Sequence, residues 1–175
     1  MDFFVLPECY VDTCFIETIV PPEKGYNHQK GSGTVAKKMK EKFFDRFALG
    51  IIDKDKRPLH YLSEFNVVAS KTNVELFKHR GRHHFFILIN PAIEVFILTN
   101  ALAGGISLRD FNLPDTLDEL RRESKSINSK KDTRFKALFS AMLEKDLEEI
   151  RQLIDWITYL KNNPYAADID WLQNQ

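Results

Sequence analysis

Three acidic residues directly follow two short apolar segments of the sequence. Glu8 comes just after the apolar run at residues 3–6, and Asp53 and Asp55 follow the run at residues 49–52. Carboxylates that are gathered in one place repel one another, so a fold that gathers them usually holds a divalent cation there. Magnesium is the usual ion when the substrate carries phosphate. The sequence therefore predicts a Mg²⁺ or Mn²⁺ site that includes Glu8, Asp53 and Asp55.

The two apolar runs must be strands if these carboxylates are to meet. Apolar residues recur at helical spacing over residues 11–19, and a second helix is expected over residues 35–47. Strand, helical segment and strand in this order are typical of a unit with parallel strands. Parallel strands have their carboxyl ends on one edge of the sheet, where open α/β sheets usually bind ligands. We therefore expect the acidic residues to lie along that edge.

The later part of the chain predicts more strands and then only helices. Strands are expected over residues 65–69, 74–77 and 84–90, and a helix should run from Pro91 to about residue 102. Beyond Gly105 the strand signal disappears, and helices are expected over residues 113–124, 133–145 and 147–161. The predicted fold is α/β, with a mostly parallel sheet flanked by helices. We expect residues 1–104 to form the α/β core and residues 105–175 a helical extension packed on it.

Charge is balanced over the whole chain but not along it. The sequence has 25 basic and 25 acidic residues, whereas residues 24–57 contain ten Lys or Arg and four acids. A basic rim around an acidic centre suits a phosphodiester substrate, which needs neutralised phosphates and a bound metal ion together. A solvated, lysine-rich helix is the alternative interpretation.

The cysteine content and the lengths of the apolar segments argue against a disulfide-rich protein and against a membrane protein. Cys9 and Cys14 are the only cysteines, too few for a disulfide framework or a four-cysteine zinc site. The start of the chain lacks a basic segment followed by a long apolar core, and no apolar stretch reaches the length of a membrane span. We expect a cytoplasmic protein with no membrane partner.

The acidic motifs also resemble those of a known family. Glu8-Cys9-Tyr10-Val11-Asp12 followed by Asp53-Lys54-Asp55 resembles the Toprim pattern, which is a strand, a Glu-Gly-x-x-Asp turn, and a later strand ending in Asp-x-Asp. Cys9 stands where the family pattern has glycine. The resemblance covers roughly residues 2–100, and it implies a small Toprim/OLD-type nuclease-like protein.

That resemblance implies a magnesium-dependent phosphoryl transfer site that acts on nucleic acid. Asp53 and Asp55 would hold one or two metal ions, and Glu8 would act as a general acid or base or as a further ligand. Asp12 would support the site. A partner protein that selects the target is a further expectation.

Glu94 is a fourth candidate for a metal ligand. The segment Pro91-Ala92-Ile93-Glu94 resembles an acidic helix start in some small Toprim-like proteins. An acid in the first turn of a helix is also favoured by the helix dipole, whether or not it binds metal. A metal ligand and a purely structural residue are therefore both open for Glu94.

The densest basic run near the expected sheet lies at residues 78–84. Between two strands it should form a turn, with Gly81 supplying the bend. Its cationic side chains would then contact phosphate, with His79 or His83 as a proton carrier, and an exposed charged hairpin is the alternative. The predicted phosphate-binding residues are Lys78, Arg80, Arg82 and His83.

Two other functions compete with a nuclease. One is a non-catalytic, Toprim-like binding or regulatory subunit, which the replacement of the motif glycine by Cys9 favours. The other is a PIN-like ribonuclease, whose first strand ends in an Asp-Thr similar to Asp12-Thr13. Asp12 follows Pro7 and Glu8 too closely to end a clean strand, so we rank the PIN-like interpretation third.

Overall fold

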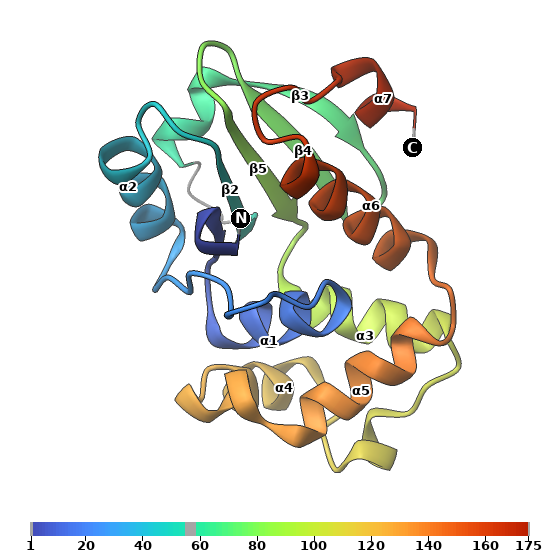
Figure 1. Ribbon diagram of the computed structural model, residues 1–175. Helices are drawn as coiled ribbons and strands as arrows, with labels where there is room; N and C mark the ends of the chain where they lie inside the picture. Colours follow the sequence, from blue (N-terminus) through green and yellow to red (C-terminus); the bar gives the residue numbers. More distant parts are fainter. Residues whose placement is uncertain (1, 55–58, 175) are drawn as a thin grey trace.

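The computed structural model describes residues 2–54 and 59–174, and its centre is one five-stranded sheet (Figure 1). The strand order is β1-β2-β5-β4-β3. β1 pairs with β2 and β2 with β5 in parallel, whereas β5–β4 and β4–β3 are antiparallel pairs. The strands are β1 (Val5–Pro7), β2 (Ala48–Asp53), β3 (Phe65–Ser70), β4 (Val74–His79) and β5 (His84–Ile89).

The sheet is mixed, so the prediction of a mostly parallel sheet was wrong in this respect. Only a few residues separate β3 from β4 and β4 from β5. Connections this short join only antiparallel neighbours, because a parallel crossover needs a dozen or more residues. The prediction of two parallel strands that lead into Glu8 and Asp53 is confirmed. The first strand begins later than expected, since residues 2–4 form a 3-10 helix.

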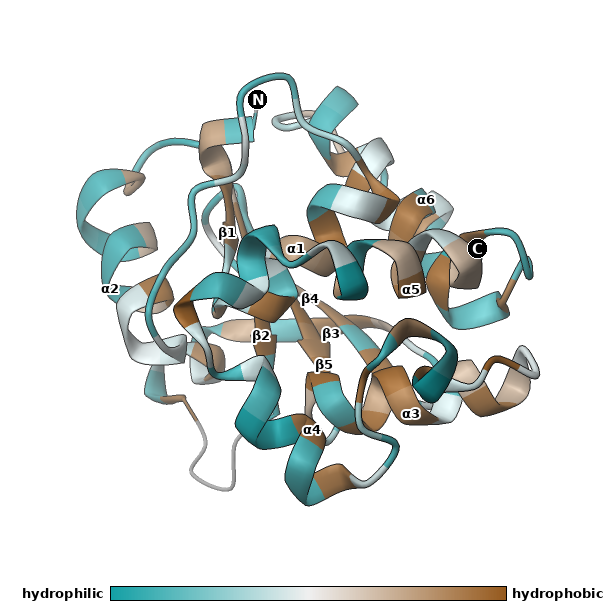
Figure 2. Ribbon diagram, turned by 90° about the horizontal axis from the view of Figure 1, so that it is seen from below, coloured by the Kyte–Doolittle hydropathy of each residue, from teal (hydrophilic) through white to brown (hydrophobic). Residues whose placement is uncertain are grey.

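Helices cover both faces of the sheet, and the α/β class is confirmed. One face packs against α2, and the other against α1, α3 and α6, with α4 and α5 outside them (Figure 1). Figure 2 shows the mostly hydrophobic central strands among helices whose residues are partly hydrophilic and partly hydrophobic. The helices are α1 (Tyr10–Ile19), α2 (Ser32–Lys42), α3 (Ile93–Ala103), α4 (Leu117–Ser124), α5 (Thr133–Leu143), α6 (Glu148–Asn162) and α7 (Ile169–Gln173), with 3-10 helices η1 (Asp2–Phe4), η2 (His60–Glu64), η3 (Leu108–Phe111) and η4 (Ile127–Lys131).

The C-terminal helices contribute to the same core as the strands. Trp156 of α6 and Phe139 of α5 are fully buried in the cluster that contains Phe85 and Ile87 of β5. Lys161, near the end of α6, pairs with Asp2 at 2.8 Å between Nζ and Oδ1. Among the described residues, no helix has the length and apolar character needed to cross a membrane.

Gly50 lets α2 and β5 approach β2 closely. A methyl group added at Gly50 would lie 2.4 Å from Cε1 of Phe86 and 2.9 Å from Cγ1 of Val35. Both neighbours are fully buried, so neither side chain has free space into which it could move. The glycine therefore sets the spacing between β2 and the layer above it.

We predict that Gly50→Ala lowers the free energy of unfolding by about 1–3 kcal/mol, because overpacking a filled core displaces side chains. Chemical denaturation monitored by circular dichroism measures this change. Gly33→Ala in α2 is the matched control, since a methyl group there meets no atom within 4 Å. An unchanged stability of Gly50→Ala would show that β2 and α2 can separate without cost.

Candidate functional site

Glu8 lies over the carboxyl end of the neighbouring strand. β1 ends with Pro7 opposite Ile51, and the Glu8 amide continues the pairing by donating to the Ile51 carbonyl at 2.9 Å. The Glu8 carboxylate in turn accepts a hydrogen bond from the Asp53 amide, at 3.0 Å from Oε2. Glu8 and Asp53 therefore meet at the carboxyl edge of the sheet, as the sequence predicts.

Asp53 links this edge to the start of α3. It is the last residue of β2 and pairs with Ile89, the last residue of β5. Its Oδ1 accepts a hydrogen bond from the Ile93 amide at 2.9 Å, in the first turn of α3. Glu94 follows, is 8% exposed, and accepts a hydrogen bond from the Ser124 hydroxyl of α4. Asp55 lies outside the described residues.

Asp12 completes the acidic group from the first turn of α1. Its side chain is 1% exposed, and its Oδ2 accepts a hydrogen bond from the Cys9 amide at 3.1 Å. Its other oxygen, Oδ1, is buried without a hydrogen-bond partner. A carboxylate oxygen buried in this way is costly for folding alone. Oδ1 of Asp12 can therefore accept a further hydrogen bond or bind a cation inside the site.

Cys9 fits its position without backbone strain. It is the N-cap of α1, with φ −130° and ψ 179°, which is extended backbone that any residue adopts. Its Sγ accepts a hydrogen bond from the Asp12 amide at 3.5 Å, and burial, followed by the charge of Asp12, raises the pKa of the thiol. Position 9 therefore does not need the conformational freedom of glycine.

The charges of neighbouring carboxylates act on Asp12 and Asp53. Burial, and then the charges of Glu8 and Glu94, raise the pKa of Asp12 to about 7. Burial, and then the charges of Asp12, Glu8 and Glu94, raise the pKa of Asp53 to about 9. Without a cation, the site therefore retains protons on carboxyl groups at neutral pH.

A pocket of about 280 Å³ opens onto this acidic group. Asp53 and Glu94 lie on its wall beside two cationic residues, Arg121 of α4 and Lys125, which follows that helix. No local pattern in the sequence singles out Arg121, because only the packing of α4 on α3 brings it to the strand ends. The lining residues are Cys9, Tyr10, Asp53, Glu94, Arg121, Ser124 and Lys125.

The donor chemistry suits a hard divalent cation, although the described side chains do not enclose one. Across residues 2–54 and 59–174, no three His, Cys, Asp or Glu side chains form a group able to hold a metal ion. Mg²⁺ commonly binds through one or two carboxylates and completes its shell with water and substrate phosphate. Asp53, which lies on the pocket wall, and Asp12, whose buried Oδ1 has no hydrogen-bond partner, are the carboxylates that could bind a cation in this mode.

The basic turn predicted to bind phosphate lies at the other end of the sheet. His84 begins β5 opposite Ala48, whereas Asp53 ends β2 opposite Ile89. The turn that precedes His84 is therefore separated from the acidic group by the length of β5. The predicted phosphate-binding residues Lys78, Arg80, Arg82 and His83 do not join the acidic site.

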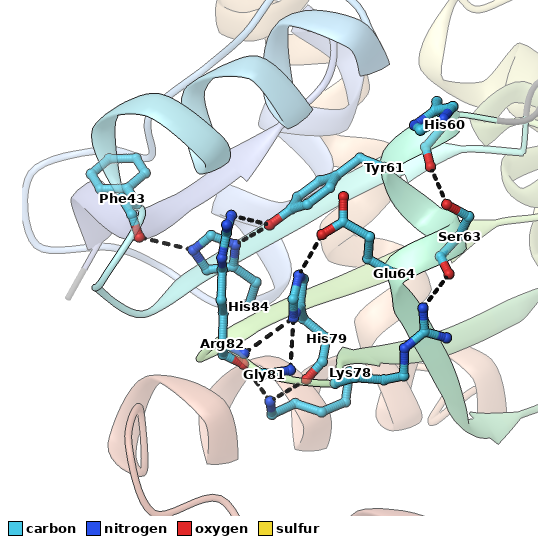
Figure 3. A network of polar contacts seen from close by, with 11 residues as sticks. Phe43, His60, Tyr61, Ser63, Glu64, Lys78, His79, Gly81, Arg82 and His84 are labelled. Atoms are coloured by element: carbon cyan, nitrogen blue, oxygen red, sulfur yellow. Dashed lines mark hydrogen bonds and ion pairs between the residues drawn. The ribbon is translucent and has the colours of Figure 1, made fainter.

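Figure 3 shows that the turn residues are engaged within the protein. Lys78 donates to the carbonyls of His79 and Arg82, and Arg80 donates to the Ser63 carbonyl. The Arg82 guanidinium lies over the Phe44 ring at 3.9 Å and donates to the Tyr61 hydroxyl. The exposed His83 ring contacts Tyr165. These contacts support a structural role in closing the end of the sheet.

His84 is the buried centre of this network. Its Nε2 donates to the Phe43 carbonyl at 2.8 Å, so its Nδ1 must accept from the Tyr61 hydroxyl at 2.6 Å. Burial lowers the pKa of His84 to about 4. A proton on Nδ1 would remove that acceptor. The folded protein therefore keeps His84 neutral.

We predict that His84 makes stability fall as pH decreases from about 6.5 to about 4. In that interval the unfolded chain binds a proton on His84 and the folded protein does not, so acid favours unfolding, by at most about 3 kcal/mol. His84→Gln should lose this part of the pH dependence, measured by urea denaturation across the interval. His60→Gln, at an exposed position, is the control. Identical slopes in wild type and His84→Gln would contradict the assignment.

We predict that Asp53→Asn stabilises the metal-free protein at pH 8. Folding at this pH requires a proton on Asp53, because its folded pKa is about 9, so stability falls as pH rises from about 4 to about 9. Asparagine needs no proton, and its oxygen can still accept from the Ile93 amide. The expected gain is about 1–3 kcal/mol, seen as a higher melting temperature. The exposed Asp45→Asn should change little, and a less stable Asp53→Asn would show that ionised Asp53 stabilises the fold.

Comparisons with protein-family models, with curated proteins and with solved structures find no match to this chain. The acidic group, its buried oxygen and the cationic wall of the pocket are therefore the observations from which a function can be argued.

Proposed function

We propose that this protein is a divalent-metal-dependent phosphoryl-transfer enzyme that acts on nucleic acid, as a small Toprim-like nuclease would. The observation that carries the proposal is the meeting of Glu8, Asp12, Asp53 and Glu94 at the carboxyl edge of β1, β2 and β5. They come from three segments that are far apart in the sequence, at residues 8–12, 53 and 94.

The energetic cost of the acidic group supports a functional role. Burial and mutual repulsion raise the pKa of Asp12 and of Asp53, so each opposes folding in its charged form. Sites that keep such destabilising groups are commonly catalytic or ligand-binding sites. A divalent cation supplies the charge that this arrangement lacks, and when bound it stabilises negative charge on the attacked phosphate and on the leaving oxygen.

The side chains around the pocket suit separate tasks in this reaction. Asp12 and Asp53 would hold the cation, with Asp55 as a further candidate. Glu8 is oriented by the Asp53 amide, which donates to its Oε2, and Glu8 would act as the general base toward the attacking water. Arg121 and Lys125 stand on the pocket wall, where a phosphate group would be neutralised. Glu94, held by Ser124, would position the group rather than react.

A non-catalytic binding or regulatory subunit is the second candidate. The observation that favours it is the absence, within the described part of the chain, of three side chains grouped to hold a metal ion. Protonated carboxyl groups would then act as hydrogen-bond donors to a bound partner. This candidate predicts binding without turnover.

Cleavage of labelled oligonucleotides with Mg²⁺ or Mn²⁺ tests the enzyme. We predict that wild type cleaves and that Glu8→Gln lowers the rate about 10²–10⁴-fold, the usual effect of removing a general acid or base. Asp53→Asn should also abolish cleavage, whereas Asp45→Asn should retain it. Glutamine preserves the acceptor for the Asp53 amide, so the Glu8 variant isolates the loss of charge.

Other outcomes separate the alternatives. Loss of cleavage in Asp12→Asn, with cleavage retained in Asp53→Asn and Asp55→Asn, would support the PIN-like interpretation. Cleavage that survives all three substitutions would contradict both enzyme assignments. Absence of cleavage in wild type, together with a melting temperature that neither cation raises, would favour the binding subunit.

A further inference from the structure

A second pocket continues from the acidic one across a single aromatic residue. It has a volume of about 560 Å³ and shares Tyr10 with the acidic pocket. η4, which packs against α1, supplies part of its wall. The two pockets therefore lie on either side of Tyr10, at the start of α1. The second pocket is lined by Tyr10, Ile127, Asn128, Lys130, Lys131, Asp132 and Thr133.

Tyr10 is held by a second ring beneath it. Its ring stacks on His28, with centroids 4.2 Å apart and an interplanar angle of 21°. His28 Nδ1 lies 3.0 Å from the Thr13 hydroxyl, which donates its own proton to the Cys9 carbonyl at 2.6 Å. Nδ1 must therefore carry the proton and donate to Thr13. The imidazole is fixed to α1 and supports Tyr10 as a rigid platform.

Only one of the two ring nitrogens of His28 takes part in this polar network. The other, Nε2, is buried without a hydrogen-bond partner. Burial also lowers the pKa of His28, which favours the uncharged ring. A neutral imidazole stacked under a tyrosine provides flat surface rather than charge. The Nδ1 hydrogen bond and the stacking on Tyr10 therefore together account for the position of His28.

Positive charge lines both sides of this platform. Arg121 and Lys125 stand at the acidic pocket, and Lys130 and Lys131 at the second one. Lys130 lies 3.3 Å from Glu17, whereas Lys125 and Lys131 are exposed. The one acid on the wall of the second pocket, Asp132, is paired with Arg134. The second pocket therefore offers cations and an aromatic face to a ligand.

We propose that Tyr10 and the second pocket bind single-stranded nucleic acid, with one base stacked on Tyr10 and the backbone following Lys125, Lys130 and Lys131. Aromatic platforms beside a cationic groove bind single strands, because every base has a flat face and every linkage a charge. The exposed side chain of Ile127, 70% accessible, adds apolar surface for a base. Bases inside a duplex are already stacked and cannot reach Tyr10. This inference rests on the proposed function, since it names the substrate of the same site.

Binding measured without metal separates this inference from catalysis. Fluorescence anisotropy of labelled oligothymidylate and oligouridylate in EDTA should show binding by wild type, weakened about tenfold or more in Tyr10→Ala. Tyr10→Phe keeps the ring and should bind like wild type, and the circular dichroism spectrum of Tyr10→Ala tests whether that variant is folded. Tyr165→Ala, a 52% exposed tyrosine near the opposite end of the sheet, is the control. The tighter of the two probes identifies DNA or RNA as the natural strand.

The salt dependence of binding tests the path of the backbone. Lys131→Ala should reduce the slope of log affinity against log salt by about 0.7, the value for one phosphate contact on a single strand. Equal affinity of wild type and Tyr10→Ala, or tighter binding of a duplex than of either single strand, overturns the inference. If single strands bind through Tyr10 but no metal supports cleavage, the inference stands and the proposed enzyme fails. If cleavage occurs and Tyr10→Ala binds single strands as tightly as wild type, the proposed enzyme stands and the inference about Tyr10 fails.

Discussion

The parallel pairing of β1 with β2 and of β2 with β5 is the constraint on which the rest of the structure depends. It places the ends of the three strands side by side, so that Glu8 bonds to the Asp53 amide and Asp53 bonds to the start of α3. The close packing at Gly50 holds β2 against α2 and β5. The hydrophobic layers on both faces stabilise this alignment. They also offset the repulsion between carboxylates that the alignment creates.

The sequence predicted the elements that create this edge because their signals are local. An apolar run followed by an acid predicts β1, which leads into Glu8, and β2, which ends at Asp53. The helical segments between the two runs predict that these strands are parallel. The short connections between β3, β4 and β5 predict antiparallel pairs, so they already argue against a mostly parallel sheet. The position of Asp12 in the site follows from the cap that Cys9 provides for α1.

Other parts of the site could not be predicted from local patterns. Arg121 and Ser124 reach the strand ends only because α4 packs on α3, which depends on contacts across the whole core. The basic turn at residues 78–84 has an evident charge in the sequence but a position that only the fold determines. Its place at the amino-terminal end of β5 and its bonds to Tyr61 and Ser63 depend on the strand order. Charge density alone does not indicate which edge of a sheet a turn occupies.

The hydrogen bond between Glu8 and the Asp53 amide also determines when the site forms during folding. The two residues are 45 positions apart, so this contact closes a long loop whose entropic cost must be met first. Until β1 and β2 pair, nothing holds Asp53 beside Glu8 and Asp12. The acidic group, and any affinity for a cation that depends on it, is a property of the completed sheet.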